Sequence, residues 1–180
     1  MKMQEHHLNE TTQQLQGPTK EQIIVCNQWA ATALDLFHAN QPTEIILQID
    51  GNDTKINLKW DSNFSKDAMR ERKKIAEEGG VSLAWFLMSV ILDYKYLQQT
   101  EIGEGVDYRF QKQRPTHDNF LQNSHYVEIS ALMKENNRNT LQKRIRDKHA
   151  QIDRGTHSEE PSSVIITLFE KPVTVKEIHR

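Results

Sequence analysis

The chain has 180 residues, 36% hydrophobic and 27% charged, which is typical of one main folded domain rather than a disordered chain. The formal net charge of −2 leaves any nucleic-acid binding to local basic patches, and the single cysteine, Cys26, excludes a disulfide framework and a multi-cysteine zinc site. Because the sequence has no run of 18 apolar residues and its N-terminus has no apolar signal segment, we expect a soluble, cytoplasmic protein without membrane contact.

The N-terminal region is predicted to begin with a disordered arm over residues 1–18, which is polar and ends at Gly17-Pro18. A helix over 20–38 follows. Thr19 and Gln22 fit the capping-box pattern at its start, since each side chain can bond the backbone N–H of the other.

A β-hairpin is predicted after this helix. Residues 44–49 and 55–60 have strand composition, and Asp50-Gly51 between them is a favoured turn dipeptide. We expect the helix and hairpin, residues 19–66, to form one folded unit with the remainder of the chain, residues 67–180.

The remainder of the chain is predicted to be mixed α/β, with a mixed central sheet flanked by helices. A helix over 67–92 is either continuous or two abutting helices, because Gly79-Gly80 weakens its middle. The elements expected after it are strands at 94–100, 106–110 and 126–131, a basic helix at 138–152 that Asn136 or Asn137 caps, and an apolar strand at 163–169.

Two acidic residues lie within predicted strands, Asp107 in the second and Glu128 in the third. An unpartnered charge is costly to bury, and two carboxylates close together raise each other's pKa unless a cation binds between them. Mg²⁺ is a hard cation that takes oxygen ligands. Asp107 and Glu128 are therefore candidate ligands of a Mg²⁺ cofactor.

The order helix–strand–strand–strand–helix–strand, with Gly-Val-Asp-Tyr at 105–108 and Val-Glu-Ile-Ser at 127–130, resembles the restriction-endonuclease-like nuclease fold. That family's motif is Asp, a variable gap, then Glu-x-Lys. The resemblance covers about residues 67–170 and implies that Asp107 and Glu128 are catalytic metal ligands. It also implies that Glu78, or else Glu77, is the acidic residue that the first helix supplies.

The sequence departs from the family's pattern at Ser130, which occupies the position of the motif lysine. Serine can hydrogen-bond the attacking water but supplies no positive charge. The resemblance therefore implies either a lost activity or a basic residue that reaches in from elsewhere. Lys134, Lys143 and Arg144 are the candidates.

The basic helix supplies a second candidate site. Its face could contact phosphates through Lys143, Arg144, Arg146 and Lys148. The alternative is a solvated helix face whose cations interact favourably with the helix C-terminus.

Two classes of function remain open. The first is a nuclease-like protein that acts on DNA or RNA with Mg²⁺, for which fold analogy suggests a bacterial defence context. The second is a non-catalytic interaction or scaffold module that assembles with a partner protein or as a homodimer, with Trp29 and Trp60 as anchors or as core residues. The alternative to a metal site at the two carboxylates is that Asp107 points outward into water and Glu128 pairs with Arg109 across two strands.

Overall fold

The Asp50-Gly51 turn connects the predicted hairpin, which consists of β2 (Thr43–Ile49) and β3 (Asn52–Lys59) in antiparallel pairing. Asp50 and Gly51 have positive φ angles of 51° and 87°, the conformation that such turns require and that these residue types tolerate. The Asp50 carboxylate also accepts a hydrogen bond from Lys176 Nζ at 2.9 Å, which ties the turn to the neighbouring strand.

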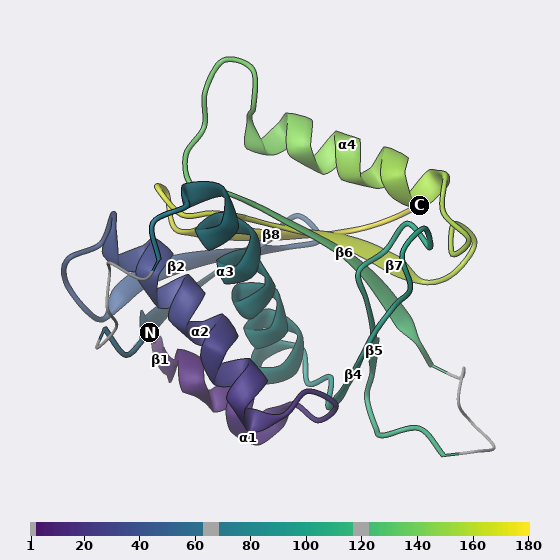
Figure 1. Ribbon diagram of the computed structural model, residues 1–180, viewed down its shortest axis with the longest axis horizontal. Coiled ribbons are helices and arrows are strands. Elements are labelled where there is room, and N and C mark those ends of the chain that lie inside the picture. Colours follow the sequence, from purple (N-terminus) through teal and green to yellow (C-terminus); the bar gives the residue numbers. More distant parts are fainter. Residues whose placement is uncertain (1–2, 63–68, 117–122) are drawn as a thin grey trace.

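The hairpin belongs to one eight-stranded mixed sheet with the order β1-β3-β2-β8-β7-β6-β5-β4 (Figure 1). The other strands are β1 (Gln4–His7), β4 (Tyr96–Gln99), β5 (Tyr108–Gln111), β6 (His125–Leu132), β7 (Ser162–Leu168) and β8 (Val173–Ile178). This computed structural model describes residues 3–62, 69–116 and 123–180. The end of the linker at 61–66 and the first two residues of the helix predicted at 67–92 lie outside these ranges.

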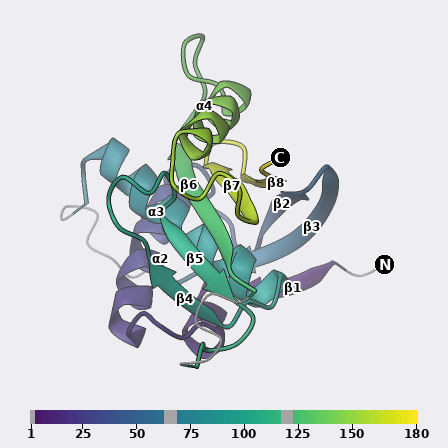
Figure 2. The same ribbon diagram turned by 90° about the vertical axis from the view of Figure 1, so that its right-hand side faces the viewer.

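Helices cover both faces of the sheet (Figures 1 and 2). The helices α2 (Lys20–Asp35) and α3 (Arg72–Phe86) lie on one face, and α4 (Leu141–Asp153) lies on the other. Side chains alternate between faces along a strand. In β6, Val127 and Ile129 join the core beneath α2 and α3, whereas Tyr126 joins the smaller core beneath α4.

The start of α2 confirms the predicted capping box. Thr19 Oγ1 accepts from the Gln22 N–H at 3.2 Å, and Gln22 Oε1 accepts from the Thr19 N–H at 2.8 Å. The helix ends at Asp35, three residues before the predicted end.

The continuous version of the predicted helix is correct, because α3 runs through Gly79-Gly80. A Cβ at Gly80 would lie 2.6 Å from Ala131 Cβ, and one at Gly79 would lie 3.1 Å from Ala30 Cα. The two glycines therefore let α3 approach both β6 and α2 closely. A π-helical segment, η2 (Leu87–Ile91), follows α3.

Three predictions about elements are wrong. Residues predicted as a disordered arm form β1, a short 3-10 helix η1 (Leu8–Glu10) and α1 (Thr11–Gln14), because Leu8 and Leu15 anchor the segment in the core. The prediction omitted β8, which lies between β2 and β7 and joins the hairpin to the rest of the sheet. Thr140 caps α4, in place of the predicted asparagines.

Within the described ranges, the helices lack the combination of length and apolar character that crossing a bilayer requires.

Candidate active site

The pairing of β5 with β6 places the two predicted carboxylates together. Tyr108, the first residue of β5, lies opposite Val127 in this antiparallel pair. Asp107 was predicted to lie within the strand but immediately precedes it, and its backbone N–H donates to Val127 O at 2.9 Å. Asp107 Oδ2 accepts a hydrogen bond from the Ile129 N–H at 2.7 Å. Both acidic side chains therefore lie on the α4 face of the sheet.

Glu128 is almost fully buried, with 1% of its side chain exposed. Its Oε1 atom accepts from Gln151 Nε2 at 2.8 Å and forms an ion pair with Lys148 Nζ. Lys148 Nζ also donates to Gln151 Oε1 at 3.0 Å. Because Lys148 and Gln151 are three residues apart on α4, they lie on the same face of the helix and reach Glu128 together.

Burial dominates the electrostatics of the carboxylate pair. Burial raises the pKa of Asp107, and the Ile129 N–H and the Lys148 ammonium only partly offset this. Burial, followed by the negative charge of Asp107, raises the pKa of Glu128 to about 7, against the effects of Lys148 and Gln151. Near neutral pH the pair therefore holds a proton or needs a cation.

One carboxylate oxygen has its hydrogen-bonding capacity unused. Glu128 Oε2 is buried and accepts no hydrogen bond from the described residues. The two carboxyl groups can hydrogen-bond each other, which requires a proton on one of them.

The loop before β5 is clamped to the end of α4, and this clamp positions Asp107. The Thr156 N–H donates to Glu104 O at 3.2 Å. Gly105, with φ of 83°, lies so close to Gly155 that a Cβ on Gly105 would be 2.7 Å from the Gly155 Cα. Only glycine fits this contact, which holds the Asp107 loop against the helix that carries Lys148.

The third predicted carboxylate does not join the pair. Glu78 lies on α3, across the sheet from α4, and its charge acts on Cys26 and Tyr108. Among the described residues, no group of three or more His, Cys, Asp or Glu side chains has the geometry to hold a metal ion. The described structure therefore brings Asp107 and Glu128 together and places Glu78 apart from them, on the other side of the sheet.

The three residues predicted to replace the motif lysine have other surroundings. Lys143 donates to Arg138 O at 3.1 Å, Arg144 donates to Asn139 Oδ1 at 3.2 Å, and Lys134 is exposed. Lys148 reaches Glu128 instead. Ser130 lies two residues beyond Glu128 on the same face and is half-buried.

A signal for Lys148 is present in the sequence. Ile145 and Ile152 form the buried stripe of α4, and Lys148 lies three residues after the first and four before the second. That spacing places Lys148 on the inward face of the helix, so it is not part of the outer basic surface. Gln151, which was not predicted, lies one turn after Lys148 on α4, but its spacing from Ile145 and Ile152 does not single it out.

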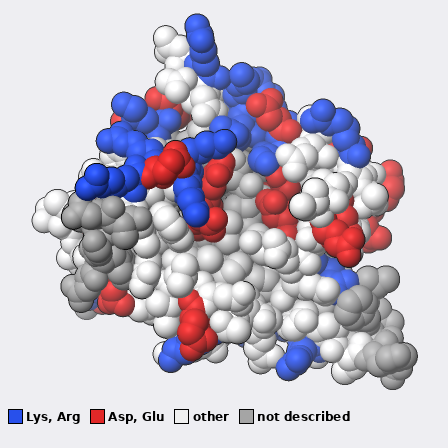
Figure 3. Space-filling view, viewed as in Figure 1, with Lys and Arg blue, Asp and Glu red and all other residues white. Residues whose placement is uncertain are grey.

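The other predicted phosphate contacts remain on the outside of α4. Lys143 and Arg146 are exposed, and Arg144 is half-buried. Figure 3 shows Lys and Arg side chains gathered over α4 and the start of α3, with Asp and Glu side chains among them. The described surface is therefore mixed in charge, with basic side chains close to the carboxylate pair.

The structure differs from the alternative in which Glu128 pairs with Arg109 and Asp107 points into water. Glu128 pairs with Lys148, whereas Arg109 donates to Gln98 Oε1. Asp107 bonds the backbone of β6, so its carboxylate is not simply directed into water.

Comparisons with protein-family models, with curated proteins and with solved structures find no match for this chain.

Proposed function

We propose that the chain is a metal-dependent nuclease in which Asp107 and Glu128 hold a Mg²⁺ ion and Lys148 supplies the positive charge that Ser130 lacks. The observation that carries the proposal is the meeting of these three side chains at one place: Asp107 from the residue before β5, Glu128 from β6 and Lys148 from α4. The restriction-endonuclease-like arrangement and a role in bacterial defence stay predictions from the sequence resemblance.

The donor set fits Mg²⁺. This ion keeps several waters and is commonly bound through one or two carboxylates together with substrate phosphate, so a third protein ligand is not required. The buried Glu128 Oε2 has no donor among the described residues, and burial, followed by the charge of Asp107, raises the pKa of Glu128. A divalent cation would relieve both conditions.

Charge balance explains why the proposed activity needs the cation. When both carboxyl groups are ionised, they and the Lys148 ammonium sum to a net charge of −1, which repels a phosphodiester. A bound Mg²⁺ would reverse that sign, neutralise phosphate charge and lower the pKa of a bound water.

Lys148 is the residue proposed to stabilise the transition state. Glu128 and Gln151 hold its ammonium group in place, so little side-chain reorganisation accompanies the reaction. The exposed Lys143 and Arg146 on the same helix would contact neighbouring phosphates.

Calorimetry with Mg²⁺ and Mn²⁺ tests the metal site directly. We expect binding to the wild type and its loss in Asp107→Asn and in Glu128→Gln, with the same two substitutions abolishing cleavage of plasmid DNA or RNA. The matched control is Asp147→Asn, an exposed acid on α4. Absence of metal binding to the folded wild type would refute the catalytic proposal.

One observation favours the second candidate function, a non-catalytic interaction module. Lys148 already forms an ion pair with Glu128, and a proton shared by the two carboxyl groups would complete the charge balance of the site without metal. In addition, α2 exposes Ile24 and Val25 at 37% and 49%. Trp29 on the same helix is half-buried, whereas Trp60, the other predicted anchor, is buried and donates to Asp35 at 2.8 Å.

This second function predicts self-association or capture of a defined partner through α2. Light scattering on wild type and Val25→Glu would detect a homodimer. A monomer in both, together with Mg²⁺ binding, would favour the nuclease.

A further inference from the structure

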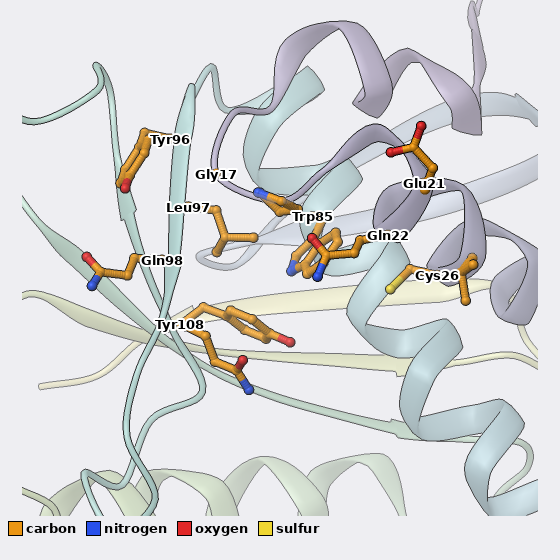
Figure 4. Close-up of a pocket in the computed structure, with 12 residues that line it drawn as sticks. Gly17, Glu21, Gln22, Cys26, Trp85, Tyr96, Leu97, Gln98 and Tyr108 are labelled. Carbon is orange, nitrogen blue, oxygen red and sulfur yellow. The ribbon is translucent and has the colours of Figure 1, made fainter.

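A second site lies on the opposite face of the sheet from the carboxylate pair. It is a pocket of about 620 Å³ between the start of α2, α3 and the strands β4 and β5 (Figure 4). The residues that matter for its chemistry are Gln22, Cys26, Trp85, Leu97 and Tyr108.

The pocket is built by the segment that precedes α2. The Gln16 N–H donates to Lys95 O at 2.8 Å, and the Leu97 N–H donates to Gln16 O at 2.9 Å. Gly17 has a φ of 114°, and a Cβ there would be 2.0 Å from Leu97 O. These contacts lock the segment onto β4 and fix one wall of the pocket.

The interior of the pocket is uncharged. Burial raises the pKa of the Cys26 thiol to about 11, and burial also raises the pKa of Tyr108, so both groups stay protonated. Among the residues that the structure describes, those that line the pocket include one carboxylate, Glu21, and no Lys, Arg or His. A phosphate or carboxylate ligand would therefore find no cation, and the fitting ligand is neutral.

One buried donor in the pocket has no hydrogen-bond acceptor. Trp85 is 5% exposed, and its Nε1 atom is buried without a partner among the described residues. Leaving such a donor unpaired costs free energy, which an acceptor on a ligand would recover. Gln22 adds a second donor, because its Oε1 is occupied by the Thr19 N–H and its amide NH₂ can point to a ligand.

Aromatic surfaces complete the site. The rings of Trp85 and Tyr108 pack edge to face, with centroids 5.6 Å apart. Figure 4 shows Gln22, Trp85 and Tyr108 around the same space. The ligand therefore needs a flat apolar face together with hydrogen-bond acceptors on its edge.

We propose that this pocket binds a nucleobase. A nucleobase is neutral and planar and carries ring-nitrogen and carbonyl acceptors for Trp85 Nε1 and Gln22 Nε2. The choice of a nucleobase over other neutral heterocycles rests on the proposed nuclease function, since Tyr108 directly follows Asp107 on the chain. The phosphate site and the base pocket thus lie on opposite faces at the same end of β5.

Nucleoside titrations test the proposal. Adenosine, guanosine, cytidine, thymidine and uridine would be titrated separately by calorimetry into wild type, Trp85→Phe and Trp29→Phe. At least one nucleoside should bind the wild type, and Trp85→Phe should weaken it about tenfold through the lost hydrogen bond. Trp29→Phe, outside the pocket, should bind like the wild type. The proposal fails if no nucleoside binds the folded wild type or if Trp85→Phe binds equally well.

A second measurement uses only the wild-type protein, so it does not depend on whether a Trp85 variant folds. In a ¹H–¹⁵N spectrum of the wild type, nucleoside should shift the indole N–H resonance of Trp85 and leave those of Trp29 and Trp60 in place. An unshifted Trp85 resonance at saturating nucleoside overturns the proposal.

Two further experiments distinguish the base-binding proposal from the nuclease proposal and show whether the bound base belongs to a strand or to a free nucleoside. Asp107→Asn should retain nucleoside binding while losing cleavage. If the wild type binds a nucleoside but cleaves neither DNA nor RNA, the base-binding proposal holds and the nuclease proposal fails. If the wild type cleaves nucleic acid but binds no nucleoside, the nuclease proposal holds and the base-binding proposal fails. Single-stranded oligonucleotides with and without one abasic position then show whether the base enters as part of a strand or as a free nucleoside.

Discussion

Replacing Glu128 by glutamine should stabilise the protein at alkaline pH. The folded-state pKa of Glu128 is raised from 4.5 to about 7, first by burial and then by Asp107. Its protonated carboxyl contributes stability that is complete below pH 4.5 and is lost as the pH rises through about 7. Glutamine mimics the protonated form at every pH, so it avoids this loss.

The size of the effect follows from the pKa change, since one pKa unit corresponds to about 1.4 kcal/mol. A rise from 4.5 to about 7 makes Glu128→Gln more stable than the wild type by about 3 kcal/mol above pH 8. For a chain of this length that is about 6–12 °C in melting temperature. Near pH 4 the two proteins should unfold at nearly the same temperature.

Thermal unfolding between pH 4 and pH 9 without divalent metal measures this difference. A matched control is Glu135→Gln, because the Leu141 N–H lowers the pKa of Glu135. The stabilisation from the Glu135 carboxylate is present above pH 4.5 and lost on acidification, so its removal gives no gain at alkaline pH. A Glu128→Gln protein that is less stable than wild type at pH 9, or a difference independent of pH, would refute the reasoning.

Three further predictions concern residues around the site. Lys148→Met should lower cleavage by about 10²-fold or more in a plasmid assay, whereas Lys55→Met, at an exposed position on β3, should change it little. Ser130→Ala should leave the cleavage rate unchanged, because Lys148 has the ion pair with Glu128; a loss as large as that of Lys148→Met would contradict this assignment. Gly80→Ala should lower the unfolding free energy in urea by about 1–3 kcal/mol through its 2.6 Å approach to Ala131, and adding Ala131→Gly should restore stability; an additive loss would exclude that contact as the cause.

Local patterns in the sequence predict much of the fold. The capping box at Thr19, the Asp50-Gly51 turn and the apolar run of β7 each depend on neighbours in the chain, so their structures follow from residue type and spacing. The same reasoning missed β8, although Val173 and Val175 alternate with polar residues, because its pairing partners come from distant parts of the chain.

The N-terminal segment shows why polar composition alone misleads. Its many glutamines suggest disorder, yet Leu8 and Leu15 are buried and Gln16 pairs with β4. Two apolar anchors at the right separation order a short segment once a core exists to receive them.

The sequence by itself predicted the strand that holds Glu128, the strand that begins beside Asp107 and the helix that carries Lys148, although it assigned Lys148 to the outer basic face. Only the tertiary structure decided which cation meets Glu128, since strand register sets the face of a carboxylate and the crossover helix then sets what lies above it. It also placed Glu78 on the other face, because Gly79-Gly80 packs α3 against the opposite side of β6. Glu128 and Lys148 are 20 residues apart, so their pairing depends on how α4 packs on the sheet, which spacing along the chain does not specify.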